Sequence, residues 1–165
     1  MMQIRAYRPQ DRSAKAGVFY RAVHEGAAPF YDAAQRAVWA PSPEPDWALP
    51  DRQLDQWCWV AEDHSGMTGF MSLDREGYLD MAFVLPEVMG KGVARALYGA
   101  LLAEARASGL TRLTVRASHL ARRFFERQGW QVDSFDPYPV DGQVFDTFLM
   151  SLDLGAMPTD AEAGP

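Results

Sequence analysis

The residues best suited to chemistry lie at Gly90-Lys91-Gly92, where an apolar run that ends at Pro86 gives way to a helix-patterned segment. Glycine lets the backbone approach a ligand closely, and the first N–H groups of a helix have no intrahelical partner. Such a junction favours an anion, above all a phosphate. The sequence therefore predicts a site for a phosphate-bearing molecule, with Lys91 and Arg95 as cations beside it.

Two common phosphate-binding motifs do not fit this junction. A P-loop requires G-x-x-x-x-G-K-[ST], but Val93 and Ala94 follow Gly92. A dinucleotide fingerprint requires G-x-G-x-x-G at the start of a βαβ unit, and Arg95 stands at its third glycine. The strand before the junction also follows a predicted hairpin, so a dinucleotide site is a poor match.

A third motif fits better. Met89-Gly90-Lys91-Gly92-Val93-Ala94 resembles motif A of the GNAT N-acyltransferase family, [QR]-x-x-G-x-[GA]. The segment 118–130 is similar to that family's second signature, N-x-x-A-x-x-F-Y-x-x-x-G-F. The spacing of the two signatures and the order of elements match over residues 3–154, and segments 19–24 and 37–41 look like the YafP-like branch.

The resemblance implies an N-acetyltransferase that moves an acetyl group from acetyl-coenzyme A, its co-substrate, directly to a primary amine of a small molecule or peptide. In this family the loop and helix N-terminus bind the pyrophosphate through backbone amides. A backbone N–H of the preceding strand, here Phe83 or Val84, binds the thioester carbonyl. The residues implied to bind coenzyme are Phe83, Val84, Met89, Gly90, Lys91, Gly92, Val93, Ala94, Arg95, Ser118, Phe124 and Phe125.

The chain departs from the family's pattern at two positions. Met89 replaces the usual Gln or Arg, which removes a polar side chain near the pyrophosphate. Phe125 replaces the tyrosine that often protonates the departing thiolate, and a phenyl ring cannot donate a proton. These departures leave an alternative open, a coenzyme-binding GNAT-fold sensor or interaction module with little or no catalysis.

Two side chains are predicted to accept the proton of the amine. Asp80 lies in an otherwise apolar strand, where alternation puts it on one face with Tyr78, Ala82 and Val84. Partial desolvation there would raise its pKa, although a structural carboxylate paired with an arginine is an equal alternative. His24 is the second candidate, because histidine is the side chain best suited to act as a base near neutral pH; the alternative is a solvated histidine at a helix end. The predicted substrate-pocket residues are Tyr31 and Trp39.

The order of expected elements predicts an α/β (α+β) domain, with a mixed, mostly antiparallel central sheet flanked by helices. Strands are expected over 3–7, 58–62, 67–73, 78–85, 113–117, 130–135 and 144–152. Helices are expected over 31–39, 51–56, 92–108 and 120–128, with a first helix from Pro9 to about Gly26. In the segment 92–108 the apolar residues Val93, Leu97, Leu101 and Ala105 share one stripe. Residues 1–154 are expected to form one GNAT domain, and 155–165 a disordered tail.

Composition narrows the class of protein. The net charge of −6 argues against nucleic-acid binding, which relies on a basic surface. Cys58 is the one cysteine, so neither an internal disulfide nor a cysteine metal cluster is expected. The chain lacks the apolar segments of a secretory signal or membrane span, and a cytoplasmic protein without membrane association is expected. Because many members of the resembled family dimerise, a homodimer is one expected assembly.

Overall fold

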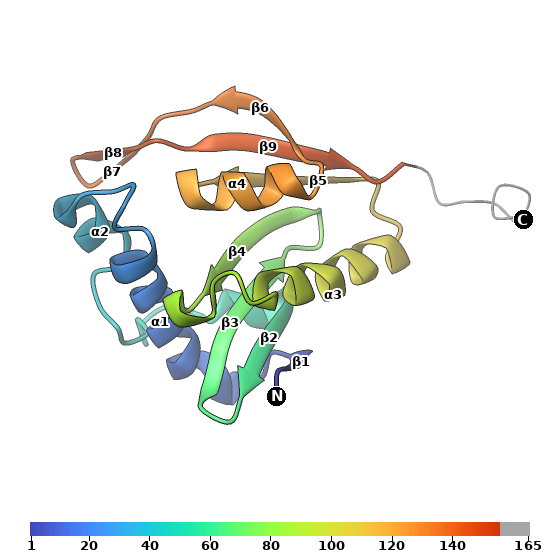
Figure 1. The fold of residues 1–165 in the computed structure, drawn as a ribbon, viewed down its shortest axis with the longest axis horizontal. Helices are drawn as coiled ribbons and strands as arrows, with labels where there is room; N and C mark the ends of the chain where they lie inside the picture. The colour runs from blue at the N-terminus through green and yellow to red at the C-terminus, as the bar shows by residue number, and fades with distance from the viewer. Residues whose placement is uncertain (156–165) are drawn as a thin grey trace, which may run out of the picture.

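The computed structural model describes residues 1–155 and confirms the mixed α/β architecture (Figure 1). The predicted disordered tail lies outside the described residues, apart from Gly155. The strands are β1 (Gln3–Ala6), β2 (Trp57–Asp63), β3 (Gly66–Leu73), β4 (Tyr78–Val84), β5 (Arg112–Ala117), β6 (Gln131–Phe135), β7 (Tyr138–Val140), β8 (Gln143–Phe145) and β9 (Phe148–Asp153). The helices are α1 (Arg12–Arg21), α2 (Ala33–Trp39), α3 (Val93–Ala107) and α4 (His119–Arg127).

One seven-stranded sheet has the order β1-β2-β3-β4-β5-β9-β6. Every neighbouring pair is antiparallel except β4 and β5, which are parallel. The parallel pair is joined by only two residue pairs, Tyr78 with Thr114 and Leu79 with Val115. Beyond them β4 and β5 diverge, and Figure 1 shows β4 running away from β5. The sheet is therefore open at its centre.

Both faces of the sheet are covered. The predicted apolar stripe of α3, Val93, Leu97, Leu101 and Ala105, is buried against the largest core, and α3 and α4 lie in front of the strands in Figure 1. A smaller core holds Val18 of α1 with Cys58 and Val60 of β2 and Phe70 of β3. Because successive strand residues point to opposite faces, these strands contribute to both cores.

The sequence prediction was wrong in one region of the C-terminal half. The expected strand 144–152 is broken into β8 and β9, and β7 pairs with β8 in a separate two-stranded sheet. Asp141 and Gly142 join them with positive φ values of 45° and 82°. Asp-Gly supports such conformations in two-residue hairpin turns, so the signal was present in the sequence.

The single cysteine is buried beneath α1. Cys58 is 6% exposed, and burial raises the pKa of its thiol to about 12. Because the thiolate is the reactive form, we expect alkylation or disulfide exchange in the native protein to be at least about a hundredfold slower than for a free thiol. Ellman's reagent should detect one thiol per chain only after unfolding in guanidinium. Rapid reaction of the native protein would contradict this burial.

Neither a membrane span nor a metal cluster is found in residues 1–155. No helix there is long and apolar enough to cross a membrane. The same residues contain no group of three or more His, Cys, Asp or Glu side chains arranged to hold a metal ion.

Candidate functional site

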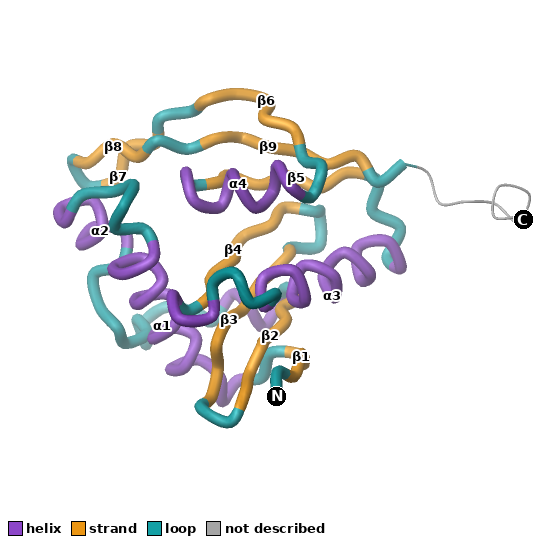
Figure 2. Tube along the Cα trace, viewed as in Figure 1, coloured by secondary structure: helices purple, strands orange, loops and turns teal. Residues whose placement is uncertain are grey.

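The glycine loop joins the end of β4 to the start of α3. Figure 2 shows the loop, in teal, leading into the purple helix. Gly90 and Gly92 have positive φ values of 78° and 83°, which favour glycine over other residues. Gly92 is the N-cap of α3 and provides no side chain to cap it. The first intrahelical bond runs from the N–H of Ala96 to the carbonyl of Gly92, so the amides of Gly92 and of residues 93–95 are available to an anion. The N–H of Lys91 is not, because it donates to the carbonyl of Val88 at 3.1 Å.

The predicted cationic and coenzyme-binding side chains surround this helix end. Lys91 and Arg95 are exposed, as is Met89, which is 40% exposed. Val93 points inward and is buried in the main core, so only its backbone can serve a ligand. The arrangement suits an anion held mainly by backbone amides with mobile positive charge nearby.

The divergence of β4 from β5 leaves backbone groups of β4 facing the gap. The N–H of Leu85 donates to the carbonyl of Thr68 on the β3 side, at 2.8 Å. In an antiparallel pair such bonds recur at every second residue, so Phe83 also faces β3. Ala82 and Val84 then direct their N–H groups toward β5. Two backbone N–H groups, those of Phe83 and Val84, were expected from sequence to donate to the thioester carbonyl. Of these, the N–H of Val84 is the one that faces the gap.

A pocket of about 230 Å³ lies beside the diverging end of β5. The predicted substrate-pocket residues Tyr31 and Trp39 both line it, with ring centroids 5.5 Å apart. Trp39 also contacts Phe83 of β4, at 6.1 Å between ring centroids, so the pocket adjoins the end of β4. Its lining is completed by Val38, Arg116, Ser118, Tyr138, Val140, Phe145 and Thr147.

Tyr31 is fixed firmly in the wall of this pocket. It is 3% exposed, and its hydroxyl donates to the carbonyl of Asp146 at 2.7 Å. The same hydroxyl accepts the backbone N–H of His119 at 3.2 Å. Burial raises the pKa of Tyr31 above its ordinary value. Tyr31 therefore stays neutral at physiological pH and serves as a rigid wall.

The second signature supplies Ser118 to the pocket but not Phe125. Ser118 is the N-cap of α4, where its Oγ accepts the N–H of Ala121 at 3.2 Å and its hydroxyl can still donate. Phe124 is half-buried beside Tyr98. Phe125 is 1% exposed and packs on Trp130, with ring centroids 4.9 Å apart. Phe125 thus belongs to the core and presents almost no surface to a ligand.

The predicted alternation around Asp80 was wrong because β4 contains a β-bulge. Leu73 pairs with Leu79 but Ser72 pairs with Met81, which leaves Asp80 as the extra residue. A bulge re-aims the side chains around it. Ala82 and Val84 pack against the main core, whereas Asp80 turns toward the segment that precedes β2.

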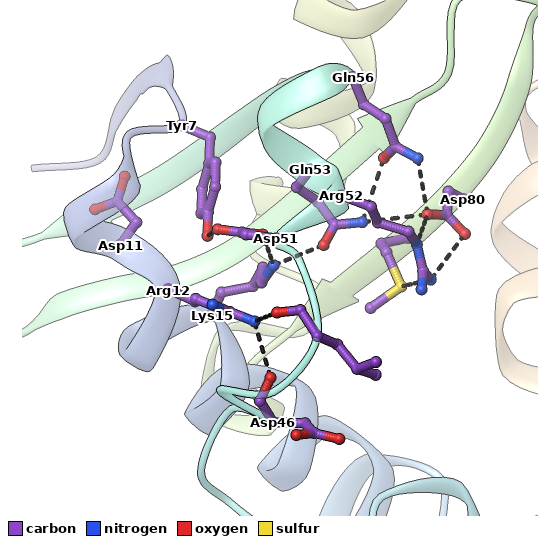
Figure 3. Close-up of polar contacts among 12 residues, drawn as sticks. Tyr7, Asp11, Arg12, Lys15, Asp46, Asp51, Arg52, Gln53, Gln56 and Asp80 are labelled. Carbon is purple, nitrogen blue, oxygen red and sulfur yellow. Dashed lines mark hydrogen bonds and ion pairs between the residues drawn. The ribbon is translucent and has the colours of Figure 1, made fainter.

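Asp80 is held by three side chains from that segment (Figure 3). Its Oδ2 accepts Nε of Arg52 at 2.6 Å, Nε2 of Gln56 at 2.9 Å and Nε2 of Gln53 at 3.2 Å. Its Oδ1 accepts Nη2 of Arg52 at 3.2 Å. Asp80 does not line the pocket beside β5. This geometry matches the alternative of a structural carboxylate paired with an arginine.

His24 lies in a π-helical turn, Ala22–Gly26, that follows α1. Its Nε2 is 2.8 Å from the carbonyl oxygen of Ala40, and since a carbonyl can only accept, Nε2 carries the proton. The ring packs against Tyr20 at a tilt of 35°, with 4.2 Å between centroids. His24 is half-buried and is also absent from the pocket lining. It ties the end of α1 to the end of α2.

Sequence reasoning missed several residues that form the pocket. Arg116, Tyr138, Phe145 and Thr147 come from β5, β7, β8 and the turn before β9. Arg116 lies two residues before Ser118 in a strand of alternating pattern. That pattern does not show which side chains from other elements contact Arg116. The Asp-Gly turn at 141–142 was the available signal that Phe145 and Tyr138 lie on one hairpin.

The family model, the curated relative and the two solved structures compared below are all described as acetyltransferases. Residues 25–151 match the model of the acetyltransferase (GNAT) domain family. The chain is 36% identical over 149 residues to the uncharacterized N-acetyltransferase YafP of Escherichia coli, covering 90% of this chain and 94% of that protein. A GCN5-related N-acetyltransferase from Rhodopseudomonas palustris superposes with a TM-score of 0.86 at 28% identity, over 92% of this chain and 95% of the other. The PaiA N-acetyltransferase of Thermoplasma acidophilum, crystallised with coenzyme A, gives a TM-score of 0.76 at 17% identity, over 93% and 99%.

Proposed function

Because the chain belongs to the GNAT acetyltransferase family, in its YafP-like branch, we propose that it transfers an acetyl group from acetyl-coenzyme A to a primary amine. The observation that carries the proposal is the continuity of three features. An uncapped helix start with two positive-φ glycines adjoins a split between parallel strands, and the split adjoins an aromatic pocket. A long thioester and a small amine can meet only where such features are contiguous.

The coenzyme is proposed to bind with its pyrophosphate at the start of α3. The amides of Gly92 and of the first turn of α3 would hold the phosphate oxygens, with the helix dipole adding to the attraction. Lys91 and Arg95 are exposed there and can follow the phosphates without being fixed in advance. The pantetheine arm then lies between β4 and β5, where Ser118 can donate its hydroxyl hydrogen.

The thioester carbonyl is proposed to accept the N–H of Val84. A donor held by strand geometry is already oriented when negative charge develops on the oxygen, so it stabilises the transition state without rearrangement. Removal of one such donor typically costs about 10²–10³ in kcat. Phe125 cannot protonate the thiolate, so we propose that the thiolate leaves unassisted or takes a proton from water.

The amine is proposed to attack from the pocket in its neutral form, without an intermediate acetylated enzyme. Neither predicted base lines the pocket. We therefore propose that water accepts the proton of the amine. Because only the neutral amine reacts, we expect kcat/KM to rise with pH up to the pKa of the acceptor amine. A direct transfer requires only that the two substrates be held together in the productive orientation.

The decisive experiment measures thiol release with acetyl-coenzyme A across a panel of amines, with mass spectrometry of the products. Acetylated amine formed in proportion to released thiol supports the proposal, and a ternary-complex kinetic pattern supports direct transfer. Tight binding of coenzyme with no turnover on any amine would favour the sensor instead. Because Cys58 is buried, thiol release reports on the coenzyme alone.

Asp80→Asn tests whether the carboxylate is a base or a structural partner. We expect kcat to stay within about threefold of wild type, since a lost general base typically costs about 10²–10⁴. Stability should fall by about 1–3 kcal/mol, because three donors lose their charged acceptor. Steady-state kinetics and urea unfolding measure the two effects. A hundredfold loss of kcat with unchanged coenzyme affinity would instead make Asp80 the base.

A further inference from the structure

The pocket beside β5 is lined mostly by aromatic and apolar side chains. Four of its residues are aromatic, and three of these rings are in mutual contact. Tyr31 and Trp39 lie 5.5 Å apart, Trp39 and Phe145 6.0 Å, and Tyr31 and Phe145 5.7 Å between centroids. Arg116 is the one charged residue of the lining in the described part of the chain, and no carboxylate lines the pocket there. The wall is therefore apolar with a single positive group.

Arg116 is held in place by contacts that leave one edge of its guanidinium free. Nη1 donates to Oδ2 of Asp136 at 2.6 Å and to Oγ1 of Thr147 at 2.9 Å. Its Cζ lies 4.4 Å from the centre of the Tyr138 ring. Within residues 1–155, Nε and Nη2 have no hydrogen-bond partner. These two nitrogens form the side-on fork that matches the two oxygens of a carboxylate.

The volume of the pocket limits the size of the occupant. About 230 Å³ is below the range of roughly 300–1,000 Å³ that is usual for ligand pockets. One small molecule of about the size of an amino acid fits such a space. A second ammonium group on the acceptor would face the guanidinium of Arg116 without a carboxylate on the lining to balance it.

We infer that the acceptor carries a carboxylate beside its primary amine, as an apolar or aromatic amino acid does, and that Arg116 binds this carboxylate. The inference rests on the proposed acetyl transfer at the same site. Arg116 acts here as a specificity residue. Asp136 and Thr147 fix the orientation of its guanidinium, and the free Nε and Nη2 bind the carboxylate of the acceptor. The amine of the acceptor then faces the end of β4. The aromatic rings receive the side chain of the acceptor.

The test compares each amino acid with the amine that lacks only its carboxylate, for example phenylalanine with phenethylamine and leucine with isoamylamine. We expect kcat/KM with acetyl-coenzyme A to be at least about tenfold higher for the acid, the effect of one charge-assisted contact. Arg116→Gln should raise KM for the acid about tenfold and leave the decarboxylated amine unchanged. Equal kcat/KM within each pair, or a preference for spermidine, would overturn the inference.

A control variant and a binding readout separate the outcomes. Arg112→Gln removes a guanidinium from the same strand, β5, at a side chain that is 55% exposed and does not line the pocket, so the preference for the acid should persist. If Arg116→Gln lowers kcat equally for acid and amine, the guanidinium acts on the acyl group and the inference is wrong. If no amine is acetylated at all, the proposed function fails. Calorimetric titration of phenylalanine and phenethylamine into the coenzyme A complex then still decides whether Arg116 selects a carboxylate.

Discussion

Replacing Asp51 by alanine is expected to lower the free energy of unfolding by about 3–5 kcal/mol, the usual cost of leaving a buried charge without its partner. Asp51 is the centre of a buried network (Figure 3). Its Oδ1 accepts Nζ of Lys15 at 2.6 Å and its Oδ2 accepts the hydroxyl of Tyr7 at 2.6 Å. The side chains of Lys15 and Asp51 are 12% and 5% exposed. Urea unfolding followed by circular dichroism measures the loss.

Two further variants test the cause of that loss. Lys15→Met combined with Asp51→Ala should recover much of the stability, because the uncompensated ammonium is removed. Glu126→Ala breaks the surface pair with Arg122, whose side chains are 47% and 38% exposed, and should cost no more than about 1 kcal/mol. Equal losses for Asp51→Ala and Glu126→Ala would show that burial does not matter here.

The network also predicts how stability depends on pH. Burial by itself would raise the pKa of Asp51, but the hydrogen bonds from Lys15 and Tyr7 outweigh it, and the folded-state pKa lies below its ordinary value. The contribution of ionised Asp51 to the free energy of unfolding is therefore complete above the ordinary pKa of about 3.9. It is lost as the pH falls through the pKa of Asp51 in the folded state. The difference between wild type and Asp51→Ala should shrink in acid below about pH 4.

Replacing Gly92 by alanine is expected to weaken coenzyme A binding about tenfold, which corresponds to about 1.4 kcal/mol. A side chain at φ 83° is strained by about 1–2 kcal/mol, and relief of that strain turns the loop amides away from the phosphates. A Cβ at Gly92 would have no atom within 4 Å, so no internal clash accounts for the effect. Isothermal titration with coenzyme A gives the affinity.

Gly99→Ala is the matched control in the same helix. Gly99 lies in the exposed middle of α3, and a Cβ there would also have no atom within 4 Å. We expect unchanged affinity and a gain in stability of about 0.5–1 kcal/mol, because alanine loses less entropy in a helix. If the two variants bind coenzyme A equally well, the glycine loop is not the pyrophosphate site.

Most of the architecture could be predicted because local patterns record which side of an element is buried. The spacing of Val93, Leu97, Leu101 and Ala105 predicted the buried face of α3, and the structure confirms all four. The β8–β9 break falls at Asp146 and Thr147, and it was missed because two polar residues within a strand pattern do not show by themselves that the strand changes partner. The loop glycines were found because positive φ restricts residue type directly.

The sequence alone determined the family, the glycine loop and the helix that follows it, since these depend on residue types at fixed short spacings. Tertiary structure decided what the polar groups do. The bulge in β4 turned Asp80 toward Gln56, 24 residues away, and Tyr31 found its partner Asp146 at a separation of 115 residues. Arg116 became a pocket residue only because β7, β8 and α2 meet it in space. Such contacts join distant segments, so their geometry follows from how whole elements pack and leaves no short-range pattern in the chain.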